Sequence, residues 1–460
     1  MGMTKGKEQY VVIGTGMAGL GAAYILNAAG VRVACYDKAS CLGGHTRSLR
    51  YDGGFVFDEG GHISFTKDEH VKEILARNVG GAHEERRLTI DNYWRSFRIP
   101  HPVQCNLRCL PADLVVQIVA DFVRESFAGS RSSFNRNTGE GLGTHEKQTY
   151  AQWLCQAYGT TFATLFPMQY GQKYHTTTMD CLTTDWIGPR MYRPTLEELI
   201  RGSLAGSSPT THYVDYYRYP TTGGFVSYLE RFSREFDIRL NRCLVQLDPR
   251  ERLLQFNDGS SVSYKAIVSS LPLPDLIPLI VDVPKDVIEA SRALAFTTVV
   301  LINIGVARAD FSESAITYFY DEEILFSRIN LPHLFSPNNA PEGCGCIQAE
   351  IYFSDKYKPL TQPPETFIEP VIADLEKCNL LREGETILLK DVVVCRFANI
   401  IYDFDREKAL RVIQGYLDDI HVTCCGRYGE WNHAWTDQAF LSGERAARAV
   451  LDGGAFLESD

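Results

Sequence analysis

Three glycines near the start of the sequence have the spacing of a phosphate-binding turn. Gly14, Gly16 and Gly19 follow a short apolar run, and an Ala/Leu-rich stretch comes directly after them. In such a turn the first glycine permits a tight bend, the second lets the backbone approach a pyrophosphate, and the third lets a helix pack closely. The N-terminus of that helix then faces the phosphates. This spacing predicts the binding of a dinucleotide.

An acid at a suitable distance supports the same prediction. A second apolar run, residues 31–36, ends at Asp37, whose carboxylate can accept hydrogen bonds from ribose hydroxyls. A GxGxxG motif alone is a weak signal, but here strand, helix, second strand and acid occur in the expected order. These residues by themselves leave NAD and FAD both open.

Three further features have a structural and a functional interpretation. The segment FDEGGHISF, residues 57–65, contains His62, which is either a partly buried histidine with local partners or part of a backbone loop against a cofactor. The pair Gly43-Gly44, taken alone, is an ordinary turn. Asp437 stands at the expected start of a long C-terminal helix, where free N–H groups point outward, and a simple helix cap would use the same position.

The elements that position these residues can also be predicted. Residues 234–272 alternate short strands with turns at 248–249 and 257–259, and they end in an apolar strand. The length of 460 residues exceeds what one hydrophobic core usually serves, so we expect two domains. With 45% hydrophobic and 22% charged residues, the composition is that of a globular protein.

Composition disfavours several classes of function. A net charge of −11 disfavours general binding to nucleic acid or to anionic membranes. No stretch reaches the roughly 18 apolar residues of a membrane span, and no signal peptide is recognisable. The 13 cysteines are scattered, without two matched CxxC pairs, which predicts reduced thiols and no metal site. We therefore expect a cytoplasmic protein.

The glycine turn, the Gly43-Gly44 pair followed by Arg47, and the C-terminal segment resemble the FAD-binding fold of flavin amine oxidases, protoporphyrinogen oxidases and nucleotide-sugar mutases. The resemblance implies an α/β fold in which a second, partly helical substrate domain is inserted into a Rossmann-type FAD-binding domain. The FAD-binding domain would comprise residues 1–75, 221–280 and 391–460. The substrate-binding domain would comprise residues 76–220 and 281–390.

The same resemblance implies a set of cofactor contacts. The second glycine pair would run along the pyrophosphate, Val245 would lie near the adenine, and the helix that starts near Asp437 would face the pyrimidine edge of the flavin. The implied cofactor-binding residues are Gly14, Gly16, Met17, Ala18, Gly19, Asp37, Lys38, Gly43, Gly44, His45, Thr46, Gly60, Gly61, His62, Val245, Gly426, Arg427, Asp437 and Gln438.

Three stretches narrow the resemblance to UDP-galactopyranose mutases. FDEGGHISF is similar to the mutase loop in which Gly61 and His62 would lie by flavin N5. Residues 173–200 are similar to a segment whose arginine, here Arg190, binds a diphosphate, and residues 316–341 would supply a second one, Arg328. Guanidinium forks suit phosphate oxygens, although each arginine alone could form a surface ion pair. The C-terminal segment departs from the mutases, because Asn432, His433 and Trp435 stand where a tyrosine is usual.

The resemblance implies an FAD-dependent nucleotide-sugar mutase that interconverts pyranose and furanose rings, an isomerase with reduced flavin N5 as nucleophile at the anomeric carbon. His62, Arg190 and Arg328 would be catalytic, and Arg190, Arg328, Asn330 and Trp186 would bind substrate. NAD(P)H is a candidate reductant. The expected partner is a nucleotide-diphosphate sugar, with no nucleic acid and no membrane; a homo-oligomer stays open, as do the nucleotide and the sugar.

Two other functions remain open on the same motifs. An oxidase or desaturase of the amine oxidase or protoporphyrinogen oxidase type would use the same glycine motifs, but it would need an apolar substrate cavity in place of two arginines. A flavin-bound protein without catalytic activity is the third alternative.

Overall fold

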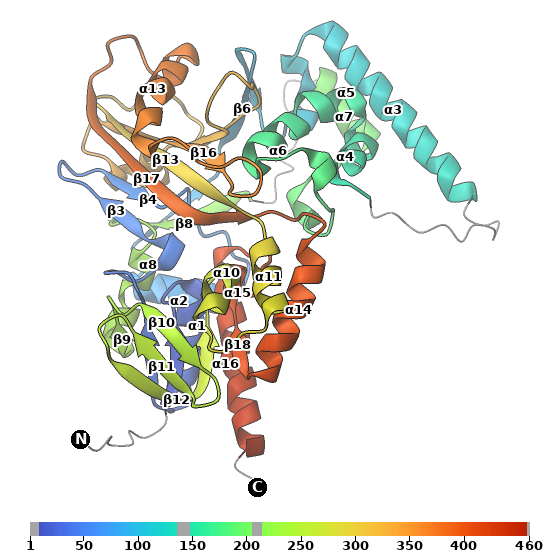
Figure 1. Ribbon diagram of the computed structural model, residues 1–460. Helices are drawn as coiled ribbons and strands as arrows, with labels where there is room; N and C mark the ends of the chain where they lie inside the picture. Colours follow the sequence, from blue (N-terminus) through green and yellow to red (C-terminus); the bar gives the residue numbers. More distant parts are fainter. Residues whose placement is uncertain (1–8, 136–147, 205–213, 458–460) are drawn as a thin grey trace. The chain divides into compact units, whose positions relative to one another are not determined.

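The computed structural model describes residues 9–135, 148–204 and 214–457, and the chain divides into two compact units (Figure 1). Unit 1 comprises Met1–Glu84, Arg218–Ala295 and Asp405–Asp460, and unit 2 comprises Glu85–Tyr217 and Phe296–Phe404. Both are discontinuous in sequence, as expected. No helix within the described ranges is long and apolar enough to cross a lipid bilayer.

The boundaries of the units differ from the expected ones at 280 and 390 for physical reasons. The strand β17 (Ile387–Ile400) pairs with β13 (Phe296–Val306) along its length, which keeps the chain in unit 2 as far as Phe404. The helix α11 (Lys285–Ala293) packs on α14 (Arg406–Asp419), which assigns residues 281–295 to unit 1.

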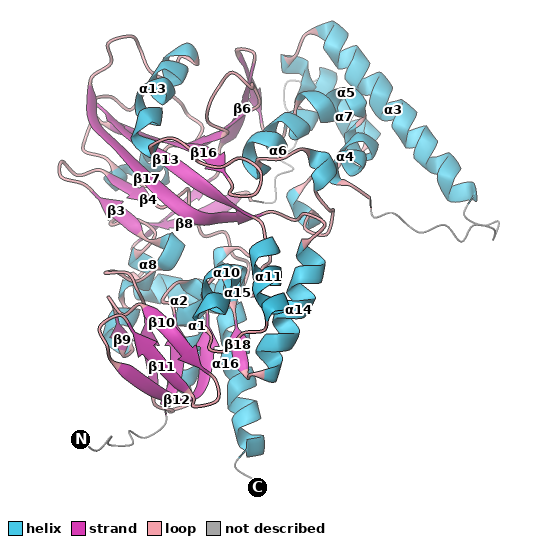
Figure 2. Ribbon diagram, viewed as in Figure 1, coloured by secondary structure: helices cyan, strands magenta, loops and turns pink. Residues whose placement is uncertain are grey.

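Unit 1 is built on a largely parallel sheet (Figure 2). Its central strand, β1 (Gln9–Ile13), is buried along all five residues, as expected for an apolar strand that is covered on both faces. The predicted strands and turns of residues 234–272 include three consecutive antiparallel strands, and the last of these also pairs in parallel with the first strand of the chain. In spatial order the strands are β10 (Leu244–Asp248), β11 (Leu253–Phe256), β12 (Ser261–Ser269), β1 (Gln9–Ile13), β2 (Val33–Tyr36) and β9 (Ile238–Arg239), with β18 (Val422–Cys424) beside β12.

Two helices of unit 1, α1 (Met17–Ala28) and α16 (Thr436–Leu457), pack with their backbones in contact. A Cβ on Gly21 would overlap the carbonyl oxygen of Phe440, and a Cβ on Gly443 would overlap that of Ala18. Glycine on both helices is therefore required for this approach. The remaining elements of unit 1 are β3 (Ser48–Arg50), β4 (Val56–Asp58), α2 (Glu69–Asn78), α8 (Ser227–Glu230), α9 (Phe232–Glu235), α10 (Leu273–Leu276) and α15 (Gly426–Gly429).

Unit 2 combines a seven-stranded, mainly antiparallel sheet with helices. One face of the sheet carries apolar side chains that pack against α13 (Ile368–Lys377) and form the core of the unit. After β17 and β13, the strands in spatial order are β16 (Gly345–Phe353), β15 (Arg328–Asn330), β14 (Ile316–Phe319), β6 (Ile90–Trp94) and β7 (Phe97–Pro100). The other helices are α3 (Ala112–Asn135), α4 (Tyr150–Tyr158), α5 (Thr160–Leu165), α6 (Pro167–His175), α7 (Leu196–Leu204) and α12 (Pro332–Phe335). The strands β5 (His83–Arg87) and β8 (Tyr216–Pro220) lie where the chain passes between the units.

Candidate functional site

Two glycines of the N-terminal turn are required by the fold of unit 1. Gly14 has φ +96°, a conformation that side chains other than glycine rarely adopt. A Cβ on Gly19 would overlap the carbonyl oxygen of Gly14, so the start of α1 can lie this close to the turn only with glycine there. Their predicted roles in bending the chain and in close packing agree with this geometry.

Gly16, in contrast, is not required by the protein itself. Its φ is −74°, and a Cβ would find its nearest neighbours at 3.7 Å, an ordinary contact distance. The helix α1 that begins after it has no side-chain cap and no acidic residue in its first turn, so its first N–H groups suit an anion. The absent Cβ therefore leaves room for a ligand against the backbone, and this geometry fits the pyrophosphate of a dinucleotide.

Asp37 also stabilises the glycine turn, a role that the sequence analysis did not predict. Its Oδ2 accepts hydrogen bonds from the backbone N–H and from the hydroxyl of Thr15, both at 2.7 Å, and its Oδ1 accepts from the N–H of Ala39 at 2.9 Å. A carboxylate offers about four acceptor positions, so one remains for a ribose hydroxyl. Asp37 thus holds the glycine turn through Thr15, and the predicted ribose contact can use only Oδ1. The neighbouring Lys38 is exposed.

The second glycine pair lies directly against the first turn. Gly43 and Gly44 both have positive φ values, +111° and +54°. The N–H of Gly43 donates to the carbonyl of Thr15 at 2.9 Å, and a Cβ on Gly44 would lie 3.1 Å from the Cα of Gly16. The following residues His45 and Thr46 continue in a short 3₁₀ turn. The structure thus brings both glycine motifs into one loop pair.

The C-terminal segment returns to the same place. A Cβ on Gly426, whose φ is +78°, would lie 2.5 Å from the Cβ of Ala18 near the start of α1. Arg427 interacts with the carbonyl of Ala434 and with Nδ1 of His433, at 3.5 and 3.2 Å. Because a guanidinium only donates, His433 accepts through Nδ1.

The start of α16 lies one residue before the predicted one. Asp437 is in its first turn, as expected for an acid near a helix N-terminus. The side-chain oxygen of Gln438 accepts a hydrogen bond from the N–H of Trp435 at 3.0 Å. Gln438 therefore caps the helix, and its predicted contact with the cofactor is left to its amide nitrogen. Val245, predicted near the adenine, is 47% exposed on β10.

The buried side chain of Asp58 fixes the start of the loop that contains His62 through three hydrogen bonds. Asp58 accepts hydrogen bonds from the hydroxyls of Ser48 and Tyr219, at 2.5 and 2.7 Å, and from the N–H of Phe225 at 2.9 Å. Gly60 has φ +91°, and its carbonyl pairs with Nδ1 of His62 at 2.9 Å. The local partner that the structural interpretation of His62 requires is present. Its contact with a cofactor stays a prediction, as does that of Gly61.

Unit 2 contains a buried cluster of polar groups around Glu350. Arg328 donates to both carboxylate oxygens of Glu350, from Nε at 2.9 Å and from Nη2 at 2.8 Å. The amide of Asn330 and the hydroxyl of Tyr352 donate to the same carboxylate, each at 2.6 Å. Four donors satisfy this acid, which is only 1% exposed, whereas the Arg328 side chain is 23% exposed. Arg328 is therefore in a buried ion pair and not in a surface one.

A row of rings connects this cluster to Trp186. Tyr352 contacts Tyr174 with ring centroids 4.9 Å apart, Tyr174 contacts His175 at 4.9 Å, and His175 contacts Trp186 at 5.2 Å. The indole N–H of Trp186 donates to the carbonyl of Thr183 at 3.1 Å. Three of the four predicted substrate-binding residues, Trp186, Arg328 and Asn330, thus belong to one connected region. The fourth, Arg190, is half-buried and ends the 3₁₀ turn Gly188–Arg190 shortly after Trp186.

Comparison with known proteins identifies the family. The family model for flavin containing amine oxidoreductase matches residues 17–451. The chain belongs to this family. A flavin is therefore its cofactor. The glycine turns and Asp37 in unit 1 fit FAD, the flavin that is a dinucleotide. No curated protein matches the sequence.

Solved structures of other flavoenzymes share the fold of this chain. A reduced UDP-galactopyranose mutase shares 21% identity with a TM-score of 0.86, over 97% of this chain and 96% of that one. A proposed protoporphyrinogen oxidase from Exiguobacterium shares 14% with a TM-score of 0.71, over 98% and 100%. A putrescine oxidase bound to putrescine shares 15% with a TM-score of 0.62, over 97% and 99%. At these identities the likeness establishes the fold alone.

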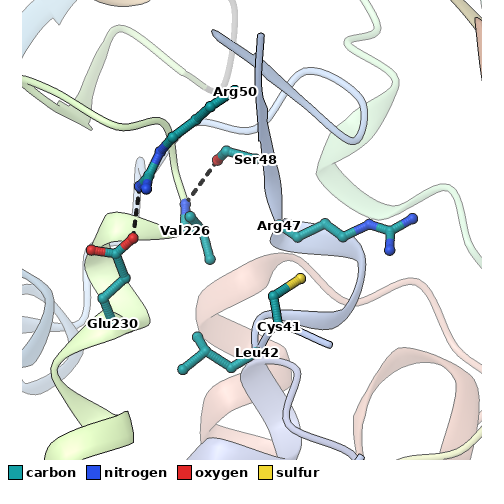
Figure 3. Close-up of a pocket in the computed structure, with 7 residues that line it drawn as sticks. All are labelled: Cys41, Leu42, Arg47, Ser48, Arg50, Val226 and Glu230. Atoms are coloured by element: carbon teal, nitrogen blue, oxygen red, sulfur yellow. Dashed lines mark hydrogen bonds and ion pairs between the residues drawn. The ribbon is translucent and has the colours of Figure 1, made fainter. Parts of the chain in front are cut away.

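A hollow of about 220 Å³ in unit 1 is lined in part by Cys41 and Leu42, which directly precede the second glycine pair in the sequence (Figure 3). Arg50 in it is paired with Glu230 at 2.7 Å, and the hydroxyl of Ser48 accepts from the N–H of Val226 at 3.1 Å. Because these groups are satisfied by one another, we assign no ligand to the hollow. Its lining residues are Cys41, Leu42, Arg47, Ser48, Arg50, Val226 and Glu230.

The sequence analysis did not single out two buried acids, Glu350 and Glu59. The position of Glu350 could have been predicted from the alternation of polar and apolar residues around it. In β16, Gln348, Glu350 and Tyr352 alternate with Ile347, Ala349 and Ile351, which is the period of a strand with one polar face. Glu59 had no comparable signal, because its partners His45 and Arg47 lie more than ten residues away in the sequence.

Asp58 makes the stability of the protein depend on pH. Burial raises the pKa of Asp58 to about 6, from 3.8, although three donors oppose this rise. Between these two pH values the folded protein binds more protons than the unfolded chain, so the contribution of Asp58 to the free energy of unfolding falls as pH rises. Two pKa units correspond to about 3 kcal/mol.

We therefore expect the free energy of unfolding of the wild type, measured in urea, to fall by about 2–3 kcal/mol between pH 4 and pH 6.5 because of Asp58. Asp58→Asn should lack this fall. The difference between the two proteins at the two pH values is the quantity to measure, because it cancels the titration of all other groups. If the wild type and Asp58→Asn differed in free energy of unfolding by the same amount at pH 4 and at pH 6.5, Asp58 would have an ordinary pKa.

Proposed function

We propose that this protein is an FAD-dependent nucleotide-sugar mutase that interconverts pyranose and furanose forms. The observation that carries the proposal is Arg328, a partly exposed cation that Glu350 holds rigidly inside unit 2. A fixed guanidinium suits an anionic leaving group such as a diphosphate. The fold that the chain shares with a reduced UDP-galactopyranose mutase supports the same function.

Arg328 and Glu350 would bind and orient the diphosphate. Only two of the five N–H donors of Arg328 go to Glu350, so donors remain for phosphate oxygens. The fork cannot rotate, because Glu350 is itself fixed by Asn330 and Tyr352. Such an arrangement lowers the cost of ordering the arginine when the substrate binds. Arg190, from the turn after Trp186, would supply the second cation.

The cofactor would be FAD, held by the two glycine loops, by the start of α1 and by Asp37. When bound in its reduced form, the flavin supplies the nucleophile for the anomeric carbon of the sugar. Unit 1 would bind the dinucleotide and would keep the His62 loop beside it. Unit 2 would bind the nucleotide-diphosphate part of the substrate.

A test compares the protein in two redox states. We expect turnover of UDP-galactopyranose or a related nucleotide sugar when the flavin is reduced with dithionite, or with NAD(P)H, and none when it is oxidised. The products are separated by chromatography, and the reductant should not be consumed in proportion to turnover. Equal activity of the fully oxidised protein, or no turnover of any nucleotide sugar in either state, would contradict the proposal.

The rival function is an amine oxidase, in keeping with the family and with the shared fold of putrescine oxidase. A carboxylate surrounded by tyrosines could attract an amine, but all four acceptor positions of Glu350 are already used by protein donors. Oxygen consumption with putrescine and other amines measures this rival directly. Steady consumption would favour the oxidase over the mutase.

A further inference from the structure

A buried carboxylate in unit 1 lies between two cationic side chains. Glu59 is 4% exposed at its side chain. One of its oxygens accepts from Nε of Arg47, and the other lies 3.1 Å from Nδ1 of His45. Arg47 and His45 are 35% and 37% exposed, so each has one side on the buried acid and another side accessible. The Arg47 pair balances the charge of Glu59 whatever the state of His45.

His45 is positioned where three cofactor segments meet. It follows Gly44, which lies against Gly16 in the first glycine turn. Its partner Glu59 directly precedes Gly60 of the His62 loop. The edge of its ring contacts Tyr428, the residue after Arg427, with centroids 5.5 Å apart. A ligand that runs along the glycine loops would therefore pass this imidazole.

The contact with Glu59 determines what the other ring nitrogen can do. An ionised carboxylate only accepts hydrogen bonds, so Nδ1 of His45 must carry a proton. In the neutral ring Nε2 then has a bare lone pair, which repels a phosphate oxygen. In the imidazolium, Nε2–H is a charged donor, which attracts one. Within the described residues, no partner is bonded to Nε2.

We propose that His45, held by Glu59, binds the pyrophosphate of FAD only as an imidazolium, so that binding of the dinucleotide is coupled to uptake of one proton. Glu59 is a positioning residue that acts through His45. The inference rests on the cofactor in the proposed function and not on the mutase reaction. It implies that the protein holds FAD more tightly as pH falls.

Among the described residues, the charged or titratable groups that face His45 come from two segments. Glu59 lies on one side, with Arg47 on the same carboxylate. From the C-terminal segment come Tyr428 and the guanidinium of Arg427, which lies 5.7 Å from the centre of the Tyr428 ring. Asp58 precedes Glu59 in the chain, but its carboxylate is bonded to Ser48, Tyr219 and Phe225. Burial raises the pKa of Asp58 to about 6, so a fraction of Asp58 is still protonated at pH 6.5. His45→Asn keeps Asp58 and therefore measures any contribution of Asp58 to the pH dependence.

The experiment measures the dissociation constant of FAD between pH 6.5 and 8.5, from the flavin fluorescence released when the holoprotein is diluted. We expect the wild type to bind about tenfold more weakly at pH 8.5 than at pH 6.5, since one charge-assisted hydrogen bond is lost. His45→Asn should be weak at pH 6.5 and show no pH dependence. The matched control is His70→Asn, since His70 forms a similar pair with Glu444 at 2.7 Å, on α2 and α16; its profile should equal that of the wild type.

Glu59→Gln distinguishes this role from a merely structural one. The amide oxygen can still accept from Arg47, while its NH₂ group donates to Nδ1 of His45 and so moves the ring proton to Nε2. Neutral His45 can then donate to phosphate, and we expect tight binding at pH 8.5 without the pH dependence. A pH dependence that persists in His45→Asn, or in a folded Glu59→Gln, would overturn the proposal. A wild type that takes up no FAD at any pH would instead overturn the proposed cofactor.

Discussion

We expect Gly16→Val to abolish the binding of FAD while the protein keeps its fold. At this position φ is −74°, which any residue adopts, and the nearest protein atoms to a Cβ would be 3.7 Å away. The protein therefore accommodates a Cβ at ordinary contact distance, but a side chain here would occupy the space against the backbone in which we place the pyrophosphate. Loss of close contact between the phosphates and the N–H groups of α1 should remove most of the affinity.

The measurement is the ratio of flavin to protein absorbance after purification, together with circular dichroism to confirm folding. Gly415→Val is the matched control, because Gly415 lies in α14 with an ordinary φ, and a Cβ there would have no neighbouring atom within 4 Å. The control should retain its flavin. Gly16→Val that is folded and fully loaded with FAD would show that the phosphates bind elsewhere.

Local sequence signals predicted the cofactor elements well, for a physical reason. The glycine turn, the strands around it and the hairpin of residues 244–256 depend on backbone rules that act over a few residues. The structure has all of them, within one or two residues of the expected positions. The contact between α1 and α16 was not predicted, because Gly21 and Gly443 are separated by most of the chain and neither lies in a motif.

The candidate substrate region was predicted only in part. Arg328 and Asn330 were found through resemblance, but the acid that fixes both was not. Glu350 lies directly opposite Arg328 in the register of β15 and β16, and such cross-strand pairing cannot be read before the strands are aligned. Long-range partners of this kind determine what a predicted residue can do. Asp37 illustrates the same point, since Thr15 takes two of its acceptor positions.

The second large effect is expected at Arg328. Replacement by Lys keeps the charge but cannot form the paired Nε and Nη2 bonds to Glu350, so the cation is no longer held in one orientation. A hydrogen bond to a charged group contributes roughly 1.5–3 kcal/mol, so the affinity for UDP should fall about tenfold to a hundredfold. Arg328→Ala should in addition destabilise the fold by about 3–5 kcal/mol, because Glu350 would be left as an uncompensated buried charge.

The affinity is measured by calorimetric titration of UDP into the wild type, Arg328→Lys and Arg190→Lys, with FAD content checked in each. The matched control is Arg308→Lys. Arg308 makes a comparable pair with Glu385 in unit 2, with its side chain 15% exposed, but it lies outside the cluster around Glu350. The control should bind UDP as the wild type does, and all variants should keep their flavin, since both glycine loops are in unit 1. Unchanged affinity in both Arg328→Lys and Arg190→Lys would remove the diphosphate site, and with it the main reason to prefer a mutase to an oxidase.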